Sequence, residues 1–222
     1  MKEHSQEFRY KQSYSRAPSA DSSRAKALAF AHDSRKFEID LYWKRAAYFW
    51  TFCGAAFVGY VTVAGSKDIT AKGDALLLVT CLGLVFSVAW WCVNRASKYW
   101  QLNWEYHVDM LEDEETGPIY KTVLQEPPRF WSLTAAYPFS VSRINQLLSL
   151  YVSFIFAVLV INTSLHYFKL SEHPDFLPTT CLVFTSACLL SFLFRGRIRF
   201  EKDIEAQRRK TTLSSYRDAS GI

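Results

Sequence analysis

Four long runs of apolar residues divide the chain, and polar or charged segments separate and flank them. No Asp, Glu, Lys or Arg interrupts any of the four runs. Each has roughly the 20 residues that a helix needs to cross a hydrocarbon core of ~30 Å. The pattern therefore predicts an all-α integral membrane protein with four transmembrane helices, at about residues 46–64, 75–93, 147–167 and 177–194.

The polar remainder of the chain divides into two ends and one long middle segment. Residues 1–34 have the Ser-rich, basic composition of a disordered leader, although residues 25–32 can begin a helix. We expect residues 35–194 to form the membrane domain, with a helical cytoplasmic layer built from 94–146. Residues 195–222 form a basic tail. The two loops on the other side are short, so any sizeable recognition surface must be cytoplasmic.

The basic residues lie almost entirely on one side of the four spans. Of the 26 Lys and Arg residues, 23 lie before residue 46, within 94–146 or after residue 194. Cytoplasmic segments carry such an excess, which places both termini in the cytoplasm. The net charge of +5 is then a sign of topology and of contact with anionic lipid, rather than of nucleic-acid binding. We expect no nucleic-acid partner.

Basic residues at the span ends are candidates for contact with lipid headgroups. Trp and Tyr residues accompany them at the start of the first span, as in an aromatic belt. The candidate headgroup residues are Lys44, Arg45, Arg95, Lys98, Arg195, Arg197 and Arg199.

The second span continues as a helical pattern to about residue 116, which predicts one helix of ~40 residues and ~60 Å. One face of the extension is expected to pack and carries Ala96, Trp100, Trp104, Val108 and Leu111. The other is expected to be solvated and carries Lys98, Gln101, Glu105, Asp109 and Glu112. The packed face either contacts other helices of the same chain or forms a seam between subunits. Its candidate contact residues are Trp100, Trp104, His107 and Leu111.

The sequence contains no GxSxG motif, P-loop, HExxH motif or Gly-rich dinucleotide turn, and no CxxC or His pair with the spacing of zinc ligands. The five Cys residues all lie within apolar spans, where they behave as small hydrophobic residues. We therefore expect neither a catalytic site nor a metal or other cofactor. One alternative is a membrane enzyme that uses His107.

The spans carry small residues at intervals of four, which allow helices to approach closely. These residues are Thr51, Ala55 and Gly59, then Gly83 and Ser87, then Ser149, Ser153 and Ala157, and finally Ala187 and Ser191. The pattern favours helix packing within the chain and between copies. Strongly polar side chains within the spans are limited to Asn162 and His166, which argues against an ion-coupled transporter.

Two aromatic segments resemble bacterial inner-membrane proteins of the RipA family, over residues 36–160. LYWKRAAYFW enters the first span and WCVNRASKYWQLNWEYHVDMLE leaves the second, followed by Gly117-Pro118-Ile119-Tyr120-Lys121. The residues that carry the resemblance are Trp43, Tyr48, Trp50, Asn94, Arg95, Ser97, Lys98, Trp100, Trp104, Glu105, His107, Leu111 and Glu112. The resemblance implies a ring-like octamer in the bacterial inner membrane, with no defined chemistry.

These observations together favour a non-enzymatic homo-oligomer that forms a ring-like pore or membrane scaffold. A second hypothesis is an adaptor that recruits a cytoplasmic protein through the Trp-rich helix over 95–115. A third, the membrane enzyme, has only His107 in its favour.

Overall fold

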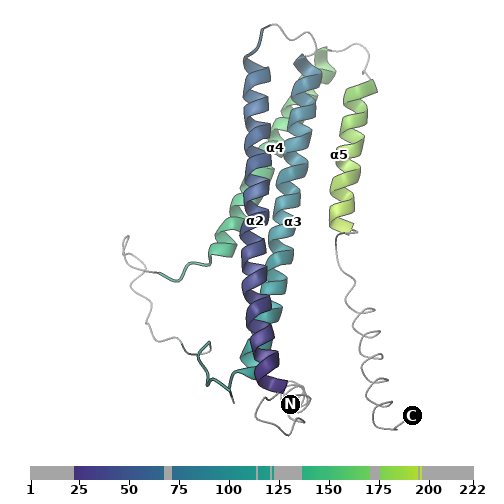
Figure 1. Cartoon of the computed structure of the whole chain (residues 1–222). Coiled ribbons are helices and arrows are strands. Elements are labelled where there is room, and N and C mark those ends of the chain that lie inside the picture. Colours follow the sequence, from purple (N-terminus) through teal and green to yellow (C-terminus); the bar gives the residue numbers. More distant parts are fainter. Residues whose placement is uncertain are drawn as a thin grey trace, which may run out of the picture.

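The computed structural model describes residues 23–67, 72–113, 115–120, 122, 137–170, 176–194 and 196. Within these residues all regular secondary structure is helical. Helices α2 (Ser23–Gly65) and α3 (Lys72–Leu111) form a long antiparallel hairpin. Helix α4 (Val141–Leu170) crosses the hairpin obliquely, and α5 (Phe176–Phe194) lies alongside α3 (Figure 1). The predicted all-α fold class is confirmed.

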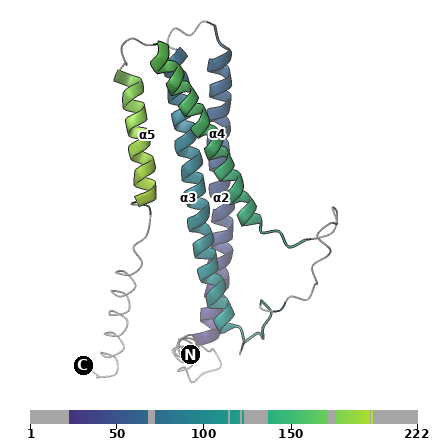
Figure 2. The same ribbon diagram turned by 180° about the vertical axis from the view of Figure 1, so that it is seen from behind.

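Helix α3 is the centre of the bundle, since α2, α4 and α5 all pack against it. The view from behind shows α4 crossing the hairpin at a slant, with its N-terminal end leaning away from α3 (Figure 2). Helix α4 begins where Ser140 Oγ accepts the N–H of Arg143 at 3.4 Å, as an N-cap residue does. The helix therefore begins six residues before the predicted third span at about 147–167.

Helix α2 is 43 residues long and α3 is 40. The predicted continuation of the second span is thus confirmed, although α3 ends at Leu111 and not near residue 116. The disordered leader expected over residues 1–34 does not extend to residue 34, since residues 23–34 form the first three turns of α2. This agrees with the alternative that a helix begins within residues 25–32. Residues 1–22 and the tail from 197 lie outside the described part of the chain.

Three helices are long and apolar enough to cross a membrane, namely α2, α3 and α4. The predicted fourth span corresponds to α5, which is apolar but only 19 residues long. The described part of the chain therefore confirms a membrane-type helical bundle with at least three candidate spans.

The hairpin extends well beyond the other two helices (Figure 1). We call this extension the stalk and define it as residues 23–45 of α2 and 94–111 of α3. At 1.5 Å per residue, the 23 residues that α2 contributes to the stalk have a length of about 35 Å. Among the described helices, α2 and α3 alone form the far end of the stalk, because α4 begins at the level of Tyr42, whose hydroxyl contacts the Ser142 carbonyl at 3.5 Å.

One face of α3 is buried along its whole length, and its residues recur with the seven-residue period of a coiled coil. The two interleaved sets are Thr80, Ser87, Asn94, Gln101 and Val108, and Gly83, Trp90, Ser97, Trp104 and Leu111. All are buried except Trp104, which is half-buried. Facing them, α2 presents Leu28, Arg35, Tyr42, Phe49 and Ala56, also seven apart. In the membrane half this seam combines polar or small residues of α3 with the large apolar Trp90, and its far end is apolar.

Candidate functional site

A cluster of polar side chains joins α2, α3 and α4 where the stalk leaves the bundle. We call it the polar clasp; it comprises Tyr42, Asn94, Asn145 and Ser149. The Asn145 amide donates to Tyr42 Oη at 2.7 Å and to Asn94 Oδ1 at 3.3 Å. The Asn94 amide donates in turn to Ser149 Oγ at 3.3 Å. All four side chains are buried.

The clasp fixes the register of three helices, because buried amides that bond to one another across helices can do so in one alignment only. Next to it, Arg45 Nη1 donates to Ser97 Oγ at 3.0 Å and lies 3.8 Å from Glu38 Oε2. The sequence analysis missed this network. Asn94 and Asn145 fall one and two residues outside the expected spans, yet the period that links Asn94 to Ser87 and Gln101 was a usable signal.

Above the clasp, small residues allow α3 and α4 to approach closely. A Cβ added to Gly83 would lie 2.0 Å from Phe156 Cε1, so the Phe156 ring occupies the space that a side chain would need. Phe156 also packs on Cys53, Ala56 and Trp90 in the core of the membrane half. Of the predicted small-residue faces, that of Gly83 and Ser87 and that of Ser149 and Ser153 are buried within the chain.

The other two small-residue faces are mostly exposed in the single chain. Thr51 and Ala55 on α2 are exposed, as are Ala187 and Ser191 on α5. Gly54 has no atom within 4 Å of the position that a Cβ would take. Asn162 and His166 are exposed as well. These faces are thus open to lipid or to another copy of the chain.

The far end of the stalk has its own small apolar core. Leu28 and Ala31 of α2 pack against Val108 and Leu111 of α3, with Trp104 at the edge. Leu111, a predicted contact residue, is therefore buried inside the chain. This agrees with the interpretation of the extension as a helix packed on a neighbouring helix.

The predicted solvated face was wrong for Gln101 and for Glu112, which directly follows α3, because both are buried. The seam of α3 selects positions by the seven-residue period and accepts a polar group such as Gln101. Ala96 and Trp100 of the predicted packed face are exposed in the single chain, which leaves them to the alternative of a seam between subunits.

One side of the stalk is aromatic. Phe30 of α2 makes an edge-to-face contact with Trp104, with ring centroids 5.9 Å apart. Trp104 contacts His107 in turn at 5.3 Å. Phe37 lies seven residues from Phe30 and so on the same side of α2. We call the set of Phe30, Phe37, Trp100, Trp104 and His107 the aromatic face.

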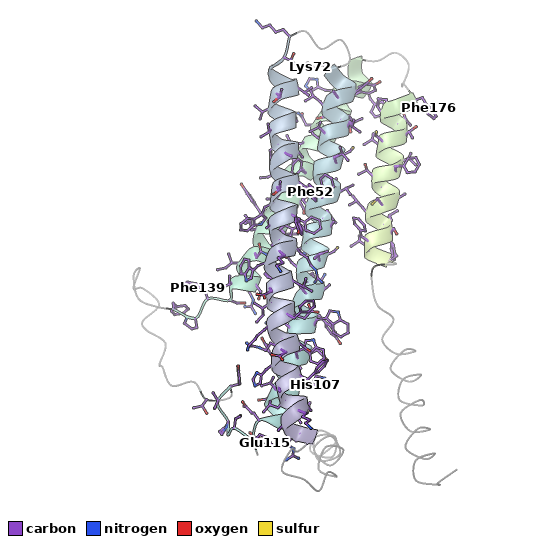
Figure 3. The ribbon with its side chains drawn as sticks, viewed as in Figure 1. Phe52, Lys72, His107, Glu115, Phe139 and Phe176 are labelled. Atoms are coloured by element: carbon purple, nitrogen blue, oxygen red, sulfur yellow. The ribbon has the colours of Figure 1, made fainter. Side chains whose placement is uncertain are left out.

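The pKa of His107 is lowered from its usual value because burial disfavours the charged imidazolium. His107 lies in the stalk, beyond the ends of α4 and α5 (Figure 3). A neutral imidazole next to Trp104 is consistent with a packing role. Three of the four predicted contact residues, Trp100, Trp104 and His107, are thus brought together on one surface.

The opposite side of the stalk contains a groove of about 290 Å³. We call it the groove face, and it comprises Arg35, Leu102, Glu105, Tyr106, Asp109 and Tyr120. Arg35 Nε lies 3.8 Å from Glu105 Oε1, and its guanidinium stands 5.2 Å from the centre of the Tyr120 ring. These contacts hold the segment after α3 against α2 and form one wall of the groove.

A buried carboxylate holds the turn that carries Tyr120. Glu112 has no exposed surface, and its Oε2 accepts the backbone N–H of Tyr120 at 3.1 Å. Its carbonyl accepts the N–H groups of Glu115, Thr116 and Gly117. Gly117 has φ of 75°, a conformation that favours glycine and lets the chain reverse after the helix. The His32 ring packs against the Tyr120 ring, with ring centroids 5.2 Å apart.

The predicted headgroup residues that are described occupy different environments. Lys44 and Arg95 are exposed, and Arg95 lies 4.9 Å from the centre of the Trp91 ring. Lys98 and Arg45 instead make contacts within the chain, Lys98 at 3.8 Å from Glu105 Oε2. The remaining predicted headgroup residues, Arg195, Arg197 and Arg199, lie outside the described residues.

Among the described residues, no group of His, Cys, Asp or Glu side chains is arranged to hold a metal ion. A second cavity, of about 300 Å³, lies between α3 and α5. Its lining is apolar and includes Cys81, Cys181 and Cys188.

The profile of the octameric membrane protein family matches residues 25–165, which is more than half of the chain. The chain belongs to this family. The resemblance inferred from the two aromatic segments is thereby confirmed. Comparison with curated proteins and with solved structures returned no match.

The part that matches the octameric membrane protein family coincides with three of the four helices. It begins near the start of α2 and ends within α4, so α5 lies outside it. The matched part contains the whole hairpin, the polar clasp and both faces of the stalk. Membership of this family, together with the three long apolar helices, identifies the chain as a membrane protein that assembles as an oligomer.

Proposed function

We propose that the protein is a non-enzymatic scaffold of the bacterial inner membrane, in which eight copies form a ring and project their stalks into the cytoplasm. The observation that carries this proposal is the α2–α3 hairpin. Its membrane half exposes apolar side chains, whereas its stalk continues the same two helices beyond α4 and α5. A membrane anchor and a protruding surface are thus parts of one rigid unit.

The proposed orientation follows the distribution of Lys and Arg, which places both termini and the stalk on the cytoplasmic side. In this arrangement α5 serves as a fourth span, since 19 residues reach about 29 Å. Lys44 and Arg95, which are exposed near the stalk–membrane boundary, contact anionic headgroups. Fluorescent labelling of single cysteines at Lys26 and Ser66 in intact cells tests this topology, and access only at Ser66 supports it.

Two features favour a scaffold over a water-filled pore. The polar groups of the bundle point inward, where Asn94, Asn145 and Ser149 bond to one another. The exposed side chains of the described membrane segments are mainly apolar, with Thr51 and Asn162 among the exceptions. A pore predicts a continuous lumen and conductance in planar bilayers, and the scaffold predicts neither.

Cryo-electron microscopy of the detergent-purified protein tests the proposal directly. We expect a ring of identical copies with helical stalks on one side and no water-filled channel on its axis. A monomer would overturn the proposal, and an open channel that conducts ions would replace the scaffold by the pore. Pull-down of one soluble protein, lost in Trp100→Ala while the ring persists, would support the adaptor role.

A further inference from the structure

We propose that neighbouring copies pack stalk against stalk, with the aromatic face of one copy seated in the groove face of the next. The inference rests on the proposed homo-oligomer and specifies its contact. It commits to a second copy of this chain as the occupant of both faces.

The exposure of aromatic residues on the stalk requires a partner that the membrane does not supply. Phe30 is 66% exposed, and Phe37 and Tyr106 are each 62% exposed. On the membrane half, side chains with comparable exposure can be covered by lipid tails or by another copy. The stalk lies outside the bilayer, where a row of exposed aromatic side chains marks a protein interface.

The two faces lie on opposite sides of the hairpin. Successive residues of a helix turn by about 100°, so residues two apart point in nearly opposite directions. Phe30 contacts Trp104 on one side, while His32 contacts Tyr120 on the other. Trp104 and Tyr106 are separated in the same way.

This arrangement suits a ring. A closed ring repeats a head-to-tail contact between two different surfaces of each copy, whereas a two-fold dimer uses one surface twice. Each stalk offers two different faces on opposite sides. The family to which the chain belongs is octameric, which is the kind of assembly that such a contact builds.

The depth of the residues indicates which of them meet. The Arg35–Glu105 contact fixes the level of α2 against α3. On α2, Phe37 lies two residues nearer the membrane than Arg35, which is about 3 Å. On α3, Leu102 lies three residues nearer the membrane than Glu105, which is about 4.5 Å. Phe37 and Leu102 thus lie at nearly the same depth. A ring axis perpendicular to the membrane keeps all copies at the same depth. Phe37 of one copy therefore faces Leu102 of the next.

Shape supports the same docking. The groove beside Leu102 and Tyr106, at about 290 Å³, has room for an aromatic side chain, and such anchors in pockets dominate protein interfaces. Charge is mixed on both faces, since exposed Asp33 and Asp40 flank Phe37 and Arg35 lines the groove beside Glu105. The apolar contact therefore carries the docking.

Cysteine cross-linking of the full-length protein in native membranes tests the contact. We expect Phe37→Cys/Leu102→Cys to form, on mild oxidation, a ladder of covalent species that extends beyond the dimer. Each single variant should behave as the wild type, whose own cysteines lie in the membrane half. Dimers formed by either single variant would show a two-fold contact and overturn the proposal, as would the absence of a ladder in the double variant.

A matched pair of substitutions separates this contact from the oligomer itself. Leu102→Glu places a charge in the groove and should reduce the oligomeric fraction at least tenfold, by light scattering on the purified protein. Leu102→Met keeps the volume apolar and should retain the assembly. A monomeric wild type would overturn the proposed function. An oligomeric wild type that is unaffected by Leu102→Glu would overturn only the stalk contact and leave the two faces to a soluble partner.

Discussion

The two halves of the α2–α3 hairpin solve the same packing problem in opposite ways. In the membrane half the seam of α3 is mostly polar or small, with Thr80, Gly83 and Ser87 buried beside one large residue, Trp90, and the outer surface is mainly apolar. At the far end of the stalk the seam is apolar, with Leu28 and Leu111 buried, and charged groups such as Glu105 stand beside exposed aromatic rings. The difference follows from the solvent. Lipid offers no hydrophobic drive for helices to associate, so close contact and hydrogen bonds must hold the membrane half together.

The largest effect should come from the core of the stalk. Leu111→Ala removes a buried side chain and should destabilise the stalk by about 2–5 kcal/mol. Because the membrane half has a separate core, the loss should be local. Hydrogen exchange measured by mass spectrometry should rise in residues 23–41 and 98–111 only. Leu150→Ala, at an exposed position on α4, is the control and should leave the stalk unchanged. Faster exchange across both halves after Leu111→Ala would show that they unfold as one unit.

A smaller effect is expected at the closest approach in the membrane half. Gly83→Ala forces the Phe156 ring to move and should cost about 1–3 kcal/mol through overpacking. Gly54→Ala is the matched control, because nothing lies within 4 Å of its new methyl group. The melting temperature in detergent should fall for the first variant and stay constant for the second. Equal melting temperatures would mean that α3 and α4 do not depend on this contact.

Each hydrogen bond of the polar clasp should contribute less to the free energy of unfolding than the Gly83–Phe156 contact. Asn94→Ala and Asn145→Ala each remove hydrogen bonds that link helices, and the coupling between them should be about 0.6–1.7 kcal/mol. A double-mutant cycle on the free energy of unfolding measures this coupling. Additive effects of the two substitutions would refute the idea that the clasp acts as a network.

The smallest effect should be the pH dependence of the stalk. Burial lowers the pKa of His107 in the folded chain, while an unfolded histidine titrates near 6.5. The unfolded state therefore binds more protons at acidic pH, and the stalk should lose stability as the pH falls through about 6.5. Exchange of stalk amides at pH 7.5 and 5.5, corrected for its intrinsic pH dependence, measures the loss. His107→Gln should remove it, and an unchanged dependence in that variant would assign it to another group.

Hydropathy alone predicted the helices, because the bilayer imposes composition and length on every segment that crosses it. It placed the first three spans within α2, α3 and α4 and predicted the extension of α3. It could not predict the seam, since Asn94 and Gln101 look like surface residues unless their seven-residue period is recognised. Trp100 looks like a residue that packs within the chain, yet it is exposed. A large apolar side chain indicates a surface that is covered in the assembled protein. It does not indicate whether the same chain or another molecule covers it.

The absence of proline from α2 and α3 has a mechanical consequence. Each helix runs without a break from the far end of the stalk to the opposite side of the membrane half, so each acts as a stiff lever. Over a rod of about 60 Å, a tilt of about 5° displaces the far end by about 5 Å. A tilt of the stalk is therefore carried along the same two helices to their ends in the membrane half.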